Sequence, residues 1–404
     1  MSGPAVTSRP AGYREAAWSW TQHLRSAGST PWSAWTGDPG QPVPGDWTVP
    51  GAAQLELVRR LAERSELDGR LFARLADLVL SRSGPGRGLA QQPLAWPGAT
   101  TSFGPPPTDP GEVPLEELVR VGVGALTELL LAAPQAAVAP TSVRRRLLTR
   151  TPAFELDGSP VTTSAVRRAL ALAGHVEGGR DPRAVIVVEP VDQALFQAWS
   201  ARAQAGAAVR WRGFAHRWAA RRLLPPSADL PALARQWADR VGADNVRLVV
   251  VPTPRSAAAL VGDALGLDLA PSRRVRLAGP PPVLPLSPAA VDVVRRVNAV
   301  LDVRVAGPRR AGRRRALAAM LAAFPEGTGQ TLTVPPPLRD WAREQGRRAV
   351  EELTSAGYPV HGRLTDAVPR FQGLASHPSR AEALDLVVQA CLTVAGPSPE
   401  GGAS

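Results

Sequence analysis

The sequence predicts an α/β protein in which helices flank a parallel sheet, preceded by a mainly helical N-terminal module. Two observations lead to this class. From about residue 144, short runs of apolar and β-branched residues alternate with amphipathic helical patterns. Before that point the apolar periodicity is helical and is interrupted by proline-rich spacers. Alternating strands and helices are typical of a parallel sheet with helices on both faces.

The length of the chain allows two domains, because 404 residues can bury two separate cores. We predict a helical module rich in tryptophan and proline at residues 1–143, an α/β domain at 144–395 and a disordered tail at 396–404. Hydrophobic residues make up 44% of the chain and charged residues 20%, which favours folded over disordered protein.

The N-terminal module is expected to contain four helical segments. The first covers residues 13–28, and a second restarts at 29–37 with Thr30 as its cap. Apolar spacing predicts a helical hairpin at 51–81 and an apolar helix at 113–133, and residues 134–142 read as a linker. Five tryptophans crowd into the first part of this module, and we interpret them as a packing nucleus rather than a ligand-stacking surface; they are Trp18, Trp20, Trp32, Trp35 and Trp47.

Three strands are expected in the second domain, each followed by a helix. The strands lie at 153–158, 183–190 and 245–254, and the helices at 163–174, 192–204 and 255–266. Helices are also predicted at 211–223, 230–242, 287–302, 313–324 and 337–357. A last helix at 378–395 is expected to end this domain.

The basic residues other than histidine are all arginine: the chain has 47 arginines, no lysine and a net charge of +12. This usage is typical of a high-GC bacterium. The excess of positive charge lies in the second domain, which indicates binding to an anionic small molecule or to a protein partner. We do not expect nucleic acid, because no reader motif accompanies the arginines.

Other classes of site are not indicated by the sequence. Cys391 is the single cysteine and lies in an apolar run, so we expect a buried thiol, and the five histidines lack ligand spacing. We therefore predict no metal site. No secretion signal or membrane span is recognised, and we expect a cytoplasmic protein.

One stretch is typical of an anion site. In DGSPVTTSAVRRAL, residues 157–170, a strand breaks at glycine and small hydroxyl residues and then enters a helix. Backbone N–H groups at such a helix start can hold phosphate oxygens. The candidate cofactor-binding residues are Gly158, Ser159, Thr162, Thr163, Ser164 and, one turn further on, Arg167.

Three stretches in this order carry a family resemblance: the one just described, VIVVEPVDQALFQAWSA and NVRLVVVPTPRSAAALVGDALGL. The chain resembles the sulfotransferase family over roughly residues 144–370, as in divergent sulfotransferase-like proteins of high-GC bacteria. The resemblance implies a P-loop-like α/β fold that binds 3′-phosphoadenosine 5′-phosphosulfate (PAPS). It also places the family's loop lysine at Val161, its phosphate-binding arginine at Val188 and its serine at Phe196, while Pro190 and Asp192 are retained.

Three functional interpretations stay open. The first is a sulfotransferase-like protein with a degenerate phosphosulfate loop and no cofactor, acting as a non-catalytic binding or regulatory protein. The second is an active PAPS-dependent sulfotransferase in which arginine replaces lysine; Arg167 pointing at the loop would favour it. The third is an arginine-rich regulator that binds nucleic acid. No catalytic residue and no oligomeric state is indicated.

Overall fold

The computed structural model describes residues 12–36, 42–81, 93–95, 106–133, 153–252, 256–270, 283–305, 307–325, 332–371 and 373–396. The chain divides into two compact units. Unit 1 comprises residues 1–134 and 380–404, and unit 2 comprises residues 135–379. The linker expected at 134–142 lies outside the described residues, as does the tail expected at 396–404 apart from Gly396.

Unit 1 is helical among its described residues. Its helices are α1 (Tyr13–Arg25), α2 (Ala52–Glu63), α3 (Gly69–Leu80), α4 (Leu115–Ala132) and α13 (Arg380–Ala395). The hairpin expected at 51–81 is present as α2 and α3, with Asp68 accepting hydrogen bonds from the first amides of α3. The helix expected at 29–37 is only a short 3₁₀ turn, Trp32–Ala34, because the backbone returns to an extended conformation at Trp35; residue 37 lies outside the described residues.

The tryptophans of unit 1 pack against one another. The ring centroids of Trp18 and Trp47 are 4.9 Å apart, and those of Trp20 and Trp32 are 5.1 Å apart. Trp20 is fully buried and donates its indole N–H to the carbonyl oxygen of Thr30 at 2.9 Å. The packing interpretation therefore describes Trp20 well, whereas the other four tryptophans are partly exposed.

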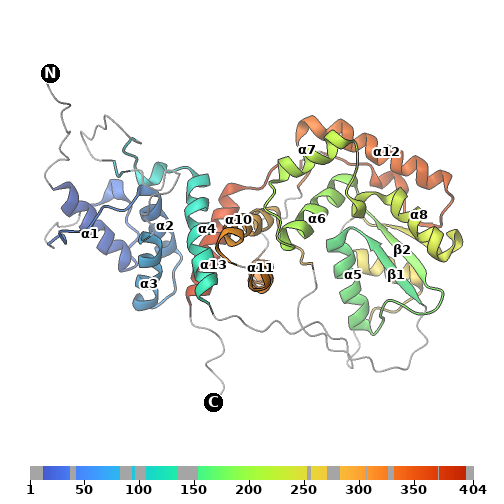
Figure 1. The fold of residues 1–404 in the computed structure, drawn as a ribbon, viewed down its shortest axis with the longest axis horizontal. Coiled ribbons are helices and arrows are strands. Elements are labelled where there is room, and N and C mark those ends of the chain that lie inside the picture. The colour runs from blue at the N-terminus through green and yellow to red at the C-terminus, as the bar shows by residue number, and fades with distance from the viewer. Residues whose placement is uncertain are drawn as a thin grey trace, which may run out of the picture. The chain divides into compact units, whose positions relative to one another are not determined.

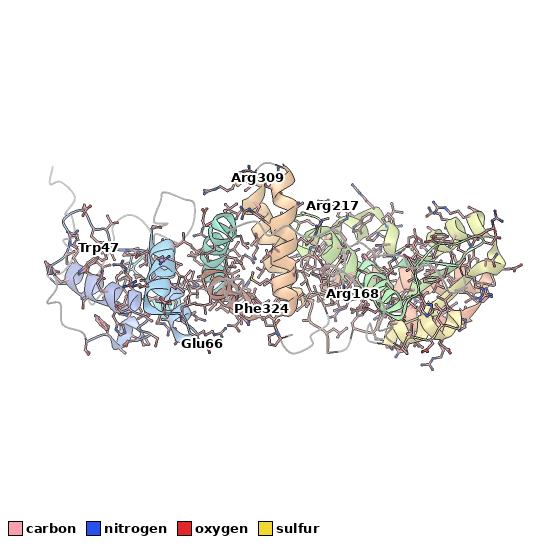
Figure 2. The ribbon with its side chains drawn as sticks, turned by 90° about the horizontal axis from the view of Figure 1, so that it is seen from below. Trp47, Glu66, Arg168, Arg217, Arg309 and Phe324 are labelled. Carbon is pink, nitrogen blue, oxygen red and sulfur yellow. The ribbon has the colours of Figure 1, made fainter. Side chains whose placement is uncertain are left out.

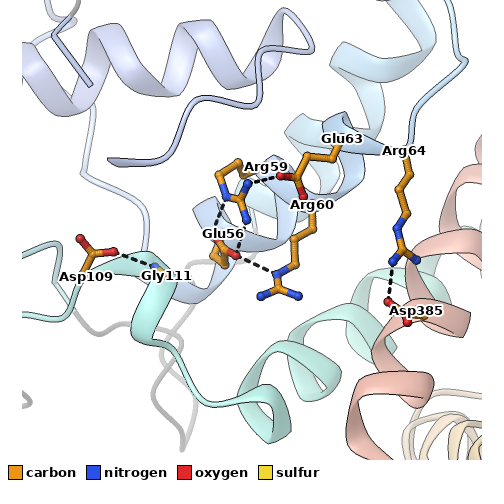
Figure 3. A network of polar contacts seen from close by, with 8 residues as sticks. All are labelled: Glu56, Arg59, Arg60, Glu63, Arg64, Asp109, Gly111 and Asp385. Atoms are coloured by element: carbon orange, nitrogen blue, oxygen red, sulfur yellow. Dashed lines mark hydrogen bonds and ion pairs between the residues drawn. The ribbon is translucent and has the colours of Figure 1, made fainter. Parts of the chain in front are cut away.

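A buried carboxylate lies on α2, which is covered on nearly all sides. Glu56 is 1% exposed and accepts hydrogen bonds from Arg59 Nε at 2.7 Å and Arg60 Nε at 2.7 Å (Figure 3). Arg59 also pairs with Glu63. Because the two guanidinium groups neutralise the carboxylate, the burial of Glu56 is tolerated.

The C-terminal helix differs from the expected domain division. We assigned residues 378–395 to the α/β domain, but α13 packs along α4 and belongs to unit 1. Gly122 of α4 leaves room for Val387 of α13, and the Cys391 thiol is fully buried between the two helices. Residues far apart in the sequence thus complete one core, since the apolar run at 113–133 requires cover on more than one side.

Unit 2 is an α/β fold built on a parallel sheet. Among the described residues the strands are β1 (Phe154–Gly158), β2 (Arg183–Val188), β3 (Val246–Val250) and β4 (Val360–His361), in the spatial order β1-β2-β3-β4. In the register of β1 and β2, Leu156 pairs with Val185. The expected strands and parallel pairing are confirmed, and β4 adds a short fourth strand at the edge.

Helices cover both faces of this sheet (Figure 1). On one face, α5 (Pro160–Ala173) and α9 (Ala257–Leu265) pack on Val185 and Val187. On the other, α8 (Leu230–Val241) and α12 (Arg339–Ser355) pack on Ile186 and neighbouring strand residues. Because β2 is buried on both faces, its sequence is a continuous apolar run rather than an alternating one.

The remaining helices of unit 2 are α6 (Val191–Gln204), α7 (Trp211–Arg221), α10 (Pro288–Arg304) and α11 (Gly307–Ala323). Figure 2 shows α11 with Arg309 near one end, and Phe324 follows the other end. Among the described residues of the chain, none of the helices combines the length and the apolar character that a membrane crossing requires.

Candidate functional site

The junction between β1 and α5 depends on a glycine. Gly158 ends β1 with a φ of +120°, and a Cβ at this position would lie 2.5 Å from the carbonyl oxygen of Val187 on β2. Only glycine adopts this conformation at such a short distance without strain. Ser159 then turns the chain, and Pro160 occupies the first position of α5, where no N–H is needed.

The first free amides of α5 are bound by a side chain of α6. Gln197 Oε1 accepts hydrogen bonds from the backbone N–H of Val161 at 3.1 Å and of Thr162 at 2.9 Å. Ser159, which precedes the helix, makes no side-chain capping bond. Gln197 therefore occupies the position that a phosphate oxygen takes at an open helix N-terminus.

A buried carboxyl group completes this arrangement. Gln197 Nε2 lies 2.9 Å and 2.7 Å from the two carboxyl oxygens of Glu189, and Thr162 Oγ1 donates to Glu189 Oε1 at 2.9 Å. We call Thr162, Glu189 and Gln197 the α5 cap network. All three side chains are buried, with exposed fractions of 0%, 2% and 5%. The network thus lies away from solvent, at the carboxyl end of β2.

The protonation of Glu189 is shifted by this burial. Loss of hydration raises the pKa of the Glu189 carboxyl above its ordinary value, whereas polar contacts from the side chains of Ser159, Thr162 and Gln197 act in the opposite direction. No arginine pairs with Glu189 among the described ion pairs. A carboxyl group beside the α5 amides also makes the position less favourable for a bound anion when it ionises.

Arg167 points to the edge of the sheet rather than to the loop. Its Nε donates to Glu177 Oε2 at 2.8 Å, and its Nη2 donates to the carbonyl oxygen of Leu156. Glu177 Oε1 in turn accepts from the Leu156 N–H at 2.8 Å. Because β1 is an edge strand, these two side chains satisfy backbone groups that would otherwise be unpaired.

The other candidate residues also make internal contacts. Thr163 Oγ1 donates to the Ser159 carbonyl at 2.9 Å, and Ser164 Oγ lies 3.4 Å from the backbone N of Val283. The retained Asp192 accepts from Thr333 Oγ1 at 2.8 Å, and burial raises the pKa of Asp192. The structure therefore brings Gly158 to Ser164 together at one turn, with their hydroxyl groups directed into the protein.

The basic segment of α11 is partly used within the fold. Arg310 and Arg314 both pair with Asp302 of α10, at 2.6 and 3.1 Å, and Arg314 also donates to the Ala205 carbonyl.

Within the part of the chain that the structure describes, no group of three His, Cys, Asp or Glu side chains lies close enough to hold a metal ion.

Two members of the α5 cap network were not recognised in the sequence. Glu189 directly follows the apolar run of β2, and polar residues at the carboxyl ends of parallel strands meet at one edge of the sheet. That signal was available for Glu189. Gln197 lies 35 residues from Thr162 within a helix, and its position gives no local signal.

Comparisons with known proteins do not place the chain in a family. No protein-family model, no curated protein and no solved structure matches it.

Proposed function

We propose that this chain is a sulfotransferase-like protein that has lost phosphosulfate binding and acts as a non-catalytic binding or regulatory protein in the cytoplasm. The observation that supports the proposal most strongly is the pair of hydrogen bonds from the Val161 and Thr162 amides to Gln197. A nucleotide phosphate would have to displace this buried amide group and lie beside Glu189. The displaced Gln197 carboxamide would lose its hydrogen bonds, and each buried polar group left without a partner costs about 1–3 kcal/mol.

The second candidate function, an active transferase that uses arginine, has less support. It requires a cation near the start of α5 to replace the lysine charge. Arg167 is engaged with Glu177 and the Leu156 carbonyl instead, and Val161 is 9% exposed and apolar. The charge and the donors that the reaction would use are therefore directed elsewhere.

Calorimetric titration with 3′-phosphoadenosine 5′-phosphate, the product nucleotide, tests the proposal. We expect that any binding is lost when salt is added and that it does not depend on Arg167. Salt is varied because a chain of net charge +12 attracts any anion weakly. Arg183→Ala is the control, since Arg183 is exposed at the opposite end of β2. Salt-resistant binding that Arg167→Ala abolishes and Arg183→Ala preserves would overturn the proposed loss of phosphosulfate binding and favour the transferase instead.

A further inference from the structure

A concave region of unit 2 lies where α12 meets the chain after β4. Arg339 and Arg343 lie one turn apart on α12, and Gly346 continues the same stripe. A Cβ on Gly346 would lie 2.9 Å from Pro369 Cδ and 3.0 Å from Val368 Cα. The segment around Pro369 therefore packs directly on α12, which holds the residues that follow it beside the two arginines.

These residues line an open, solvent-facing cavity of about 720 Å³. Its walls include three arginines and one aromatic ring, with proline and leucine side chains between them; they are Arg339, Arg343, Arg370, Phe371, Pro369 and Leu374. We call this cavity the arginine pocket. Its volume lies in the range of small-molecule sites, about 300–1,000 Å³. It is larger than a single inorganic anion requires, and none of the described residues that line it is acidic.

The ring of Phe371 orders two of the guanidinium groups. Arg339 Cζ lies 5.5 Å and Arg343 Cζ 5.2 Å from the ring centroid. Phe371 itself is 9% exposed, so its position is set by packing. Arginine held against an aromatic ring loses less conformational entropy when it binds a ligand, because its rotamer is already restricted.

The charge of the pocket is only partly balanced by the protein. Arg343 pairs with Asp340, whose side chain is 98% exposed, and Arg370 pairs with Asp366 at 2.9 Å. Arg339 makes no ion pair among the described residues, and its Nε is buried without a hydrogen-bond partner there. Because no carboxylate among the described residues neutralises Arg339, an anionic ligand in the pocket would be attracted to its guanidinium group.

We propose that the arginine pocket binds a small organic molecule that carries a phosphate or sulfate monoester. Guanidinium groups bind such tetrahedral anions through two parallel N–H···O bonds, and Arg339 has donors available for this. The remaining volume, lined by Phe371, Pro369 and Leu374, accommodates the organic part. This site is independent of the α5 cap network and of the proposed function.

Calorimetric titration of the full chain with glucose 6-phosphate, glucose 6-sulfate, inorganic phosphate and glucose tests the assignment. We expect one or both esters to bind, inorganic phosphate to bind more weakly and glucose not to bind. Arg339→Gln should weaken ester binding by about tenfold or more, the loss expected for a charged hydrogen bond. Arg167→Ala should leave ester binding unchanged. The result for the arginine pocket is therefore independent of the titration that tests the proposed function.

The matched control is Arg347→Gln, which removes the same charge from an exposed position of α12 where Arg347 pairs with Glu344. Equal weakening by Arg339→Gln and Arg347→Gln would show attraction to net charge alone and overturn the proposal. Absence of ester binding at low salt, or equal affinity for inorganic phosphate, would also overturn it. If Arg339→Gln does not fold, Arg370→Gln serves instead, because the Arg370 side chain is 79% exposed.

Discussion

Removal of the Gln197 side chain should destabilise unit 2 strongly. In the Gln197→Ala variant the backbone N–H groups of Val161 and Thr162 lose their acceptor, and Glu189 loses the hydrogen bonds of the amide group. Two orphaned amides at about 1–3 kcal/mol each predict a loss of about 2–6 kcal/mol in the free energy of unfolding. Domains are stable by only about 5–15 kcal/mol, so the effect is easily measured.

Urea unfolding followed by circular dichroism measures this change, with Gln236→Ala as the control. Gln236 is exposed on α8, so its removal should change the free energy of unfolding by no more than about 0.5 kcal/mol. Hydrogen exchange of the peptide around Val161 should also lose protection in Gln197→Ala alone. If both variants have the same urea midpoint and equal protection at Val161, Gln197 does not cap α5 and the reasoning is refuted.

Three further outcomes are expected. Because burial raises the pKa of Glu189, its ionisation destabilises the fold, so stability should fall as pH rises above the ordinary value of 4.5. Urea midpoints across this range should show a smaller fall for Glu189→Gln. Gly158→Ala should cost more unfolding free energy than Gly357→Ala, because both have positive φ but only Gly158 faces a neighbouring carbonyl, that of Val187; urea unfolding that ranks them equally would contradict this. Burial raises the pKa of Cys391 to about 12, so a thiol reagent should label it only after denaturation, and rapid labelling of the native chain would disprove its burial.

The sequence predicts the secondary structure of unit 2 well because the burial of each strand and helix determines which of its positions are apolar. The run of β2 is apolar at consecutive positions, as a strand covered on both faces requires. The glycine that ends β1 and the proline that opens α5 likewise mark the turn, because backbone geometry restricts which residues fit there. The position of the candidate site at this turn therefore follows from local chemistry.

Only the tertiary structure shows which groups bind the backbone amides at that turn. Helix amides need acceptors, but the sequence does not state whether a ligand or a distant side chain provides them. Gln197 supplies the acceptor across 35 residues, and Arg167 pairs with the edge of β1 rather than with the loop. The place of α13 beside α4, and the meeting of Arg339 with Arg370, also arise from packing between segments far apart in the chain. Such contacts depend on three-dimensional proximity, which local periodicity does not encode.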